Sequence, residues 1–238
     1  FGGNVPLFED LSHWAAGTTS NGETATMNAS LLNGTRTLFT ELDFAALSDL
    51  GWEVVRTDYG DAPDSGSGTG HGNYETLSLS GGPSHTIVSG LFLGNSVDGD
   101  SGIVQDESAS TDDQATTGSS DDEDGVLSLL DLLGTVGTQP TITLLATNTT
   151  GSAATLYGWI DFNQNGAFDN ATERAQITVP NNTTDGRFTL TFPVIPNGSA
   201  GTTYARFRLS TDVAAANSTG AASGGEVEDY AATITQLS

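Results

Sequence analysis

The sequence predicts a mainly β protein, an antiparallel β-sandwich or jelly-roll-like domain preceded by a short segment made mostly of loops and one helix. From Thr57 onward, short runs rich in β-branched and aromatic residues alternate with Gly, Asn and Pro, and helical periodicity disappears. About seven such runs follow one another with no helical pattern between them, which favours a sandwich over a βαβ architecture. The one helical pattern lies before residue 56.

The expected strands lie within seven runs, at residues 85–94, 141–150, 154–162, 174–179, 187–195, 203–211 and 229–237. Side chains of a strand point alternately to its two faces, so Arg206 and Arg208 share one face, and Phe207 and Leu209 share the other. Residues 127–137, "LSLLDLLGTVG", fit either a pair of strands or a single helical turn, and the sequence leaves both alternatives open.

The expected helix lies in "TELDFAALSDLGW", with Thr40 as its N-cap, Asp43 as the acidic residue three positions on, and Gly51 as its C-terminal stop. One helix cannot build a core alone, so another element must cover its apolar stripe. We therefore divide the chain into residues 1–56 and residues 57–238. The expected stripe consists of Leu42, Ala45, Ala46, Leu47 and Leu50.

The 238 residues carry a formal net charge of −24, from 30 acidic residues against six arginines and no lysine. Such a surface repels phosphates and anionic lipids, which excludes nucleic acid as a partner and argues against membrane insertion. Divalent cations would offset the self-repulsion, and calcium prefers carboxylate and carbonyl oxygens. The absence of cysteine excludes disulfides, thiol catalysis and cysteine-ligated zinc.

Composition also bears on localisation. A lysine-free, acidic chain rich in Gly, Thr, Asn and Ser is typical of a bacterial protein that is secreted or exposed at the cell surface, with calcium in place of disulfides. No apolar run approaches the roughly 18 residues of a membrane span. Residue 1 does not begin a signal peptide, and we expect the chain to be a fragment or a processed product.

The stretch "YGWIDFNQNGAFDNATERAQITV" interrupts two strand-like runs with oxygen-bearing side chains at alternate positions and a glycine that permits a sharp turn. This order resembles the first, third, fifth and ninth positions of an EF-hand loop, but the loop lies between strands and its glutamate comes one residue late. We expect a structural calcium site, and the alternative is a polar hairpin turn. The candidate ligands are Asp161, Asn163, Asn165, Asp169 and Glu173.

A second group of acidic residues lies near the two ends of the β region. If the first and last strands are neighbours, these carboxylates meet and need either calcium or the guanidinium groups of Arg206 and Arg208 between them. Paired carboxylates also occur in glycosidases, but no nearby pattern indicates a substrate cleft. The candidate ligands are Asp58 and Asp61 in "DYGDAPDS", and Glu226, Glu228 and Asp229 in "GEVEDY".

Residues 98–124 carry ten acidic residues and no basic residue. Blocks of like charge repel one another, so a solvated or disordered loop is one interpretation. The alternative is that the "SSDDEDG" end folds around calcium through Asp121, Asp122 and Asp124.

Several motifs together resemble the GEVED domain of bacterial exported proteins over about 57–235: "DYGDAPDS", "SHTIVSGLFLG", "SSDDEDGV", "LYGWIDFNQNGAFDNATE", "GTTYARFRLST" and "GEVEDY". They occur in the family's order. The resemblance implies an accessory β-sandwich of large secreted or surface proteins, with attachment or calcium-dependent rigidity as its role. His85 lies within one of these motifs, where we expect packing or a hydrogen bond.

The segment "LSHWAAG" to "SDLGWEV" is similar to the C-terminal part of leishmanolysin-like zinc metallopeptidases. In that pattern His13 stands for the third zinc histidine, Met27 lies under the metal, and a helix ending in Asp-x-Gly-Trp closes the subdomain. A catalytic zinc needs three protein ligands and an open position. His-Glu-x-x-His is absent, so this chain alone should not hydrolyse peptides, and zinc would require a missing N-terminal part.

Three hypotheses for function follow. The first is a calcium-stabilised extracellular binding and scaffolding module of a secreted bacterial metallopeptidase, which attaches it to a surface, to polysaccharide or to other extracellular proteins. The second is one half of a two-chain zinc metalloprotease. The third is a calcium-dependent structural subunit that self-associates into an extracellular sheath or filament.

Overall fold

The structure is a computed structural model of the chain. It describes residues 14–15, 17–20, 23–26, 41–50, 52, 55–97, 99, 102–103, 105, 107–109 and 123–236. The chain divides into two compact units: Phe1–Val55 with Gln114–Ser120, and Arg56–Asp113 with Asp121–Ser238. Among the described residues, no helix combines the length and the apolar character needed to cross a membrane.

The first unit contains helix α1 (Glu41–Asp49) and the short strands β1 (Thr19–Ser20) and β2 (Glu23–Thr24), which pair antiparallel. The Trp14 indole donates to Asp43 Oδ1 at 2.8 Å, and the Thr26 backbone N–H donates to Asp43 Oδ2 at 2.8 Å. Asp43 is therefore buried and joins helix α1 to the segments of Trp14 and Thr26, in addition to the capping role that the sequence predicted for it.

One residue of the expected apolar stripe, Leu50, does not lie on the buried face of the helix. Leu42 is buried, but Leu50 is 71% exposed, because α1 ends at Asp49 and Leu50 lies beyond the face that packs. Trp52 is likewise 69% exposed. Thr40 and Gly51, the expected cap and stop, lie outside the described residues.

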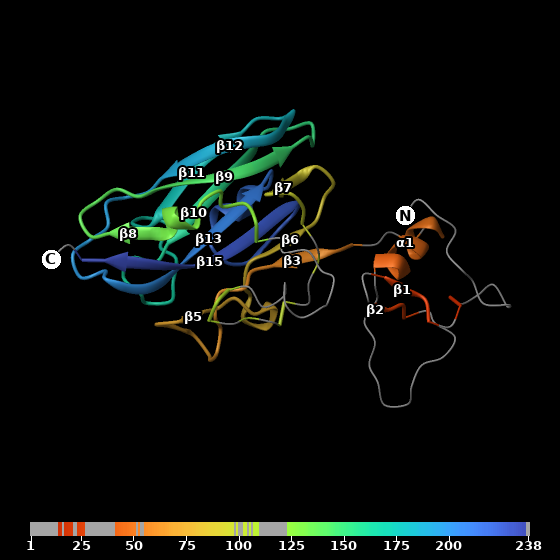
Figure 1. The fold of residues 1–238 in the computed structure, drawn as a ribbon, viewed down its shortest axis with the longest axis horizontal. Helices are drawn as coiled ribbons and strands as arrows, with labels where there is room; N and C mark the ends of the chain where they lie inside the picture. Colours follow the sequence, from red (N-terminus) through yellow and green to blue (C-terminus); the bar gives the residue numbers. More distant parts are fainter. Residues whose placement is uncertain are drawn as a thin grey trace. The chain divides into compact units, whose positions relative to one another are not determined.

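The second unit is a mainly β sandwich, which confirms the expected fold class (Figure 1). One layer has the strand order β11 (Arg174–Val179), β10 (Ala154–Ile160), β13 (Gly201–Ser210), β15 (Gly225–Thr235) and β8 (Leu133–Thr135). The other has the order β12 (Thr183–Thr191), β9 (Thr141–Asn148) and β7 (Leu91–Leu93). Neighbouring strands are antiparallel in both layers, except that β8 runs parallel to β15.

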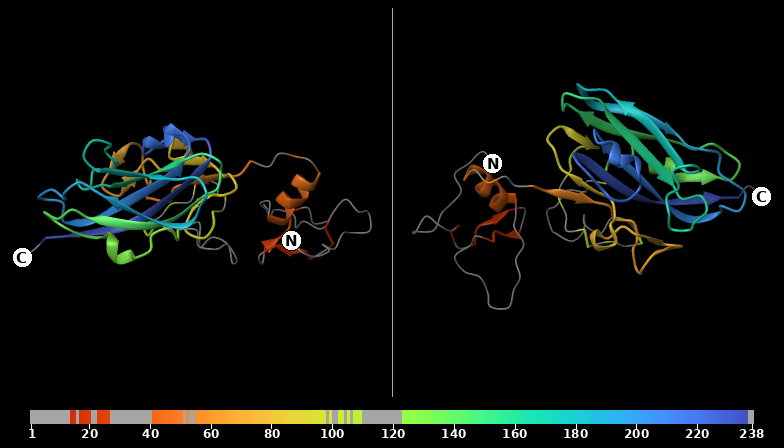
Figure 2. Two further views of the ribbon diagram at one scale, coloured as in Figure 1. Left: turned by 90° about the horizontal axis from the view of Figure 1, so that it is seen from above. Right: turned by 180° about the vertical axis from the view of Figure 1, so that it is seen from behind.

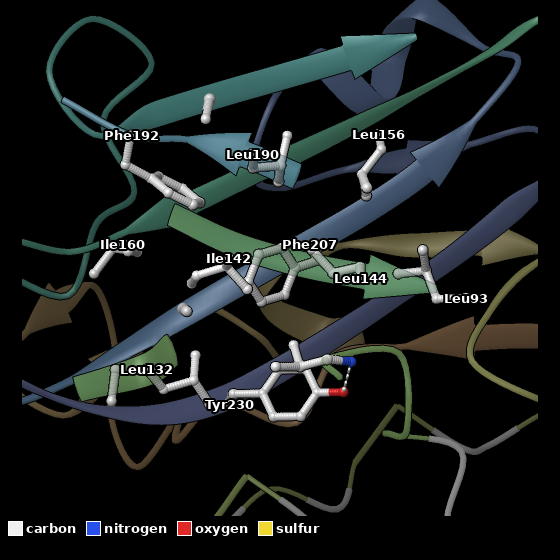
Figure 3. Packing of buried hydrophobic residues seen from close by; sticks show 14 of the residues in the cluster. Leu93, Leu132, Ile142, Leu144, Leu156, Ile160, Leu190, Phe192, Phe207 and Tyr230 are labelled. Carbon is white, nitrogen blue, oxygen red and sulfur yellow. Dashed lines mark hydrogen bonds between the residues drawn. The ribbon is translucent and has the colours of Figure 1, made fainter. Parts of the chain in front are cut away.

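The main hydrophobic core lies between these layers (Figure 3). Phe207 and Leu209 of β13, Leu144 of β9 and Leu156 of β10 are fully buried there. Each such side chain stabilises the fold by about 1.5–3 kcal/mol relative to an exposed position. The alternation predicted for β13 is confirmed, because its apolar residues face this core and its arginines face the opposite side.

The outer face of the five-stranded sheet carries a further layer, which we call the cover and define as residues 57–90 and 212–224. The cover contains β3 (Thr57–Tyr59), β6 (Ser84–Thr86) and β14 (Ala221–Ala222), which form a sheet in the order β14-β6-β3. It also contains the hairpin β4–β5 (Thr69–Gly70 and Asn73–Tyr74) and the 3₁₀ turns η1 (Ser78–Ser80) and η4 (Val213–Ala216). Figure 2 shows this layer from two further directions.

A second hydrophobic cluster lies between the cover and the sheet. Tyr74 and Phe168 stack with ring centroids 4.9 Å apart, and Tyr74 meets Tyr204 edge-on at 5.1 Å. Trp159 is fully buried in the same cluster, so it is not an exposed platform for a sugar ring. Both faces of β10 and β13 are therefore buried.

The ambiguous stretch 127–137 combines both alternatives. A 3₁₀ turn, η3 (Leu129–Leu132), leads directly into β8. Leu132 is buried beneath the turn, while Leu129 and Leu130 are exposed. Apolar residues occupy consecutive positions in this stretch, so periodicity alone could not separate the two halves.

Candidate functional site

The connection between β10 and β11 holds two buried carboxylates. Asp161 directly follows β10, and Glu173 directly precedes β11; their exposed fractions are 0% and 1%. The antiparallel pairing of the two strands brings these ends of the connection together, as the hydrogen bond from the Ile160 backbone N–H to the Glu173 carbonyl shows. The structure thus joins the first and last of the predicted calcium ligands at the base of one loop.

The Asp161 carboxylate organises the first half of the loop. Its Oδ2 accepts from the Gly166 backbone N–H at 2.9 Å and from the Tyr74 hydroxyl at 2.9 Å. Its Oδ1 accepts from the Asn165 N–H at 3.3 Å. Burial, and then the charge of Asp161, raises the pKa of Tyr74 well above its ordinary value, so Tyr74 stays protonated and remains a donor.

The Glu173 carboxylate organises the second half. Its Oε1 accepts from the Phe162 backbone N–H at 2.9 Å, and its Oε2 accepts from the Asp169 N–H at 2.8 Å. Burial, and also the nearby charge of Asp161, raise the pKa of Glu173 to about 7, although these hydrogen bonds act in the opposite direction. A group that lowers the cost of both negative charges would therefore stabilise the loop.

The three remaining loop residues present their side chains at the surface, and each closes a local turn. Asn163 Oδ1 accepts from the Asn165 N–H at 3.1 Å, and Asn165 Oδ1 accepts from the Ala167 N–H at 2.8 Å. Asp169 Oδ1 accepts from the Ala171 N–H at 2.9 Å. These turns explain why Asn and Asp occur at alternate positions even without an ion.

The donor set of this loop suits a hard cation. It consists only of carboxylate and amide oxygens, and each oxygen that accepts one hydrogen bond keeps a second lone pair. Within the described residues, no three His or acidic side chains converge as a metal-binding group, so a cation here would depend on the amides as well. The five predicted residues remain the candidate ligands.

The loop is held against the cover by a close backbone approach. Gly166 has φ +76°, and a Cβ atom at this position would lie 2.1 Å from the Gly70 carbonyl oxygen and 2.2 Å from the Asn73 carbonyl oxygen. The β4–β5 hairpin therefore packs directly on the loop, and only glycine fits between them. On the other side, the Gln164 side chain donates to the Ser199 carbonyl at 2.8 Å.

In the second predicted group, the acidic residues near the two ends of the β region, an arginine pairs with one of the carboxylates. Arg206 Nε lies 2.7 Å from Asp229 Oδ1, and a terminal nitrogen of Arg206 donates to Asp229 Oδ2 at 2.7 Å. Asp229 Oδ2 also accepts from the Ala62 backbone N–H at 2.8 Å, and Asp58 accepts from the Val227 N–H at 2.6 Å. The first and last strands do meet, and the guanidinium alternative is the one that the geometry supports.

Glu226 and Glu228 do not join Asp58 and Asp229, because alternation along β15 turns them to the opposite face. Glu226 accepts from the Leu93 backbone N–H at 2.5 Å, and Glu228 accepts from the Gly125 N–H at 2.9 Å. The Tyr230 hydroxyl donates to Glu228 at 3.1 Å. The acidic residues of "GEVEDY" thus lie on opposite faces of one strand, and a single ion cannot bind them all.

The remaining candidates are scattered. Asp61 is buried in the cover. Asp124 accepts from the Asn95 backbone N–H at 2.8 Å and from the Asn95 side-chain amide, which fixes the described end of the acidic stretch. Asp121, Asp122 and His13 lie outside the described residues, and so does the zinc position expected at His13, on which the two-chain protease hypothesis depends.

Sequence reasoning missed one polar contact, between Arg208 and His85. Arg208 Nε donates to His85 Nε2 at 2.9 Å, and both side chains are fully buried. The sequence predicted a packing or hydrogen-bonding role for His85, and it predicted Arg208 as a candidate partner of the carboxylates near the two ends of the β region, whereas its hydrogen bonds go to neutral acceptors. It carried no signal that joined the two residues, since they lie 123 positions apart.

A family model, the GEVED domain, matches residues 155–233. The match runs from β10 into β15 and is narrower than the resemblance predicted from the motifs, which began near Thr57. GEVED domains are small modules of the extracellular type that occur in exported proteins, which is consistent with a binding or scaffolding role. The comparisons give no support to the metallopeptidase resemblance of the N-terminal segment. Neither a curated protein nor a solved structure matches the chain.

Proposed function

We propose that this chain is a non-catalytic scaffolding and binding module of an exported bacterial protein, stabilised by calcium, which attaches its parent polypeptide to other extracellular proteins or to polysaccharide. One observation carries the proposal. The charged side chains of its most distinctive motifs are buried, and they hold distant segments of the chain together. Asp229, Glu226 and Glu228 are each at most 1% exposed, so a substrate in solution has no access to them.

The contacts of these residues support an architectural role. Each carboxylate accepts a backbone N–H from a segment more than 100 residues away in the sequence: Ala62 for Asp229, Leu93 for Glu226 and Gly125 for Glu228. Hydrogen bonds to charged groups contribute about 1.5–3 kcal/mol each, and leaving such a group buried and unpaired costs more. The motif thus fastens the cover and β7 to strand β15.

Calcium at the β10–β11 loop is the second part of the proposal. Asp161 and Glu173 would bind the ion at the base of the loop, and Asn163, Asn165 and Asp169 would supply the outer oxygens. The raised pKa of Glu173 supports this assignment, because a divalent cation offsets the two neighbouring negative charges. The ion would have a structural task, since the loop fixes the β4–β5 hairpin.

Calcium should raise the melting temperature of the wild-type chain by about 5–10 °C over the value in excess chelator, at a concentration about 100-fold above Kd. Differential scanning calorimetry measures this shift. The shift should be larger at pH 8 than at pH 6, because Glu173, with a pKa of about 7, must lose its proton to bind the ion. Magnesium serves as the cation control.

A pair of charge-matched variants sharpens the experiment. Asp169→Asn keeps an oxygen for the turn to the Ala171 N–H but removes a ligand charge, so the calcium shift should shrink. Asp185→Asn removes the same charge from an exposed position outside the loop and should leave the shift intact. Melting curves that superimpose in calcium and in chelator would contradict the calcium part of the proposal.

Attachment is tested separately, on a glycan array probed with the labelled chain in calcium and in chelator. Binding to a defined class of polysaccharide that depends on the folded domain would support that partner. A folded chain that binds no glycan would contradict it and would leave protein partners, which pull-down with extracellular proteins of the source organism tests.

A further inference from the structure

His85 and Arg208 join the cover to the main sandwich at a fully buried contact. His85 lies at the centre of β6, between β3 and β14, and Arg208 lies on β13. Arg208 Nε donates to His85 Nε2 at 2.9 Å. The two other guanidinium nitrogens donate to four backbone carbonyl oxygens of the cover, those of Ser84, Asn217, Thr219 and Gly220. One side chain thus holds two parts of the cover.

The protonation state of His85 is fixed by this geometry. Arginine Nε always carries a proton, so His85 Nε2 must be the nitrogen without one. An imidazolium would place an N–H against an N–H and one positive charge against another. All five guanidinium donors of Arg208 go to neutral acceptors, so the histidine lone pair is part of what makes burial of this charge tolerable.

The surrounding charges do not cancel this repulsion. On β13, Arg206 adds a second positive charge, and its direct partner is Asp229 of β15. Asp58 of β3 accepts from the Val227 N–H, and Asp212 accepts from Ala214 and Ser223 at the surface. Strand β14 contributes only Ala221 and Ala222, and Glu226 of β15 accepts from Leu93 of the opposite layer.

We propose that His85 is an acid-sensitive latch: its protonation breaks the contact with Arg208 and releases the β14-β6-β3 sheet from strand β13, while the two layers of the sandwich stay folded. Release would take Ala222 of β14 out of the second hydrophobic cluster and so open an edge of that cluster to solvent. The domain would then present an apolar surface in acidic surroundings and hide it at neutral pH.

The direction of the pH dependence follows from the histidine. Burial, and then the charge of Arg208, holds the pKa of His85 well below its ordinary value of 6.5. A depressed pKa in the folded state means that the contribution of neutral His85 is present above pH 6.5 and is lost as the pH falls below it. The equilibrium constant for opening of the cover should therefore rise about tenfold between pH 7.5 and pH 5.5.

Glu173 has the opposite effect, so a global melting curve cannot test the latch. The pKa of Glu173 is raised, and protonation of this group between pH 7 and pH 4.5 stabilises the β10–β11 loop. The measurement must therefore resolve the cover from the rest of the domain.

Amide hydrogen exchange of the full chain, followed by NMR and corrected for the intrinsic pH dependence, provides that resolution. The probes, which we call the cover amides, are those of Ala62 and Val227, because each donates across the contact between the cover and β15; the reference amides are Leu145 and Phe192 of the sandwich. From pH 7.5 to pH 5.5 we expect the cover amides to lose about tenfold in protection and the reference amides to keep theirs.

Two variants test the assignment to His85. His85→Gln keeps a neutral acceptor at the position of Nε2 and cannot titrate, so the cover should lose its pH dependence. His71→Gln removes an exposed histidine of the same segment and should behave as the wild type. If His85→Gln does not fold, the wild-type comparison still decides. Equal protection at the two pH values, or an unchanged pH dependence in a folded His85→Gln, would overturn the proposal.

Discussion

Asp229 is fully buried and is neutralised by one guanidinium, that of Arg206, through two hydrogen bonds of 2.7 Å. A buried pair of this kind contributes little relative to two apolar residues, but removing one partner leaves the other charge buried and uncompensated. A further terminal nitrogen of Arg206 donates to the Ser218 carbonyl, so the pair also fixes the cover. Specific placement, more than net stability, is what this residue supplies.

Asp229→Asn should lower the free energy of unfolding by about 3–5 kcal/mol, because it leaves the Arg206 charge buried without its counter-ion. Urea denaturation followed by circular dichroism measures the change. Asp185→Asn alters the net charge by the same amount at an exposed position and should change stability by less than about 0.5 kcal/mol. Equal effects of the two variants would show that the pair is not the cause.

At the scale of single residues, the sequence predicted which side chains share a face of a strand, but it did not predict the partners of the buried charges. The alternation of β13 predicted that Arg206 and Arg208 share a face, and the structure confirms it. Glu226 and Glu228 of "GEVEDY" likewise share one face of β15. Alternation does not identify the partner of each charged side chain. Asp229 lies on one face of β15 and its neighbours lie on the other, and each face has a different partner.

At the scale of elements, hydrogen bonds to two buried carboxylates hold both halves of the β10–β11 connection. Its first half closes on Asp161 and its second half on Glu173, and Gly166 lets the β4–β5 hairpin approach the backbone. The sequence predicted the loop, its glycine and its oxygen pattern. The hairpin that packs on it could not be predicted, since Gly70 and Asn73 are polar turn residues with no apolar signal that points to a partner.

Gly166→Ala should destabilise the domain by more than about 3 kcal/mol, because the new methyl group meets two carbonyl oxygens and the residue must keep a positive φ. Gly151→Ala is the matched control. Gly151 also has a positive φ, +95°, but a Cβ there meets nothing within 4 Å, so only the backbone strain of about 1–2 kcal/mol remains.

Thermal unfolding of both variants, compared with the wild type in chelator, separates the steric contact from the strain. A loss of stability in Gly166→Ala no greater than that in Gly151→Ala would show that the hairpin does not rest on the loop as described.

At the scale of the whole molecule, the sequence predicted the sandwich because local patterns specify strands and their buried faces. It did not predict the cover, whose strands β3, β6 and β14 have two or three residues each and lack a detectable period. Their positions come from hydrogen bonds between distant segments, such as that of Val227 to Asp58, 169 positions apart. Pairings over such separations leave no trace in a single sequence.

A chain that ends at residue 200 should therefore show no cooperative unfolding transition. It lacks β13 and β15, which carry Arg206, Arg208 and Asp229 and which lie at the centre of the five-stranded sheet. A chain that begins at residue 56 should keep the full transition, because residues 1–55 belong to the other compact unit. Circular dichroism with heating compares the two, and a sigmoidal transition in the shorter chain would contradict this dependence.

The separation of Asp58 and Val227 along the sequence also affects the order in which the domain can fold. During synthesis from the N-terminus, the segment that begins at Asp58 cannot take its final position until Val227 of β15 has been synthesised. Until then the cover has neither the Val227 N–H nor the Asp229 carboxylate as a partner, and β13 lacks its neighbour β15 in the sheet. If the parent protein is exported as we propose, this late closure would keep the domain open while it passes through a translocation channel.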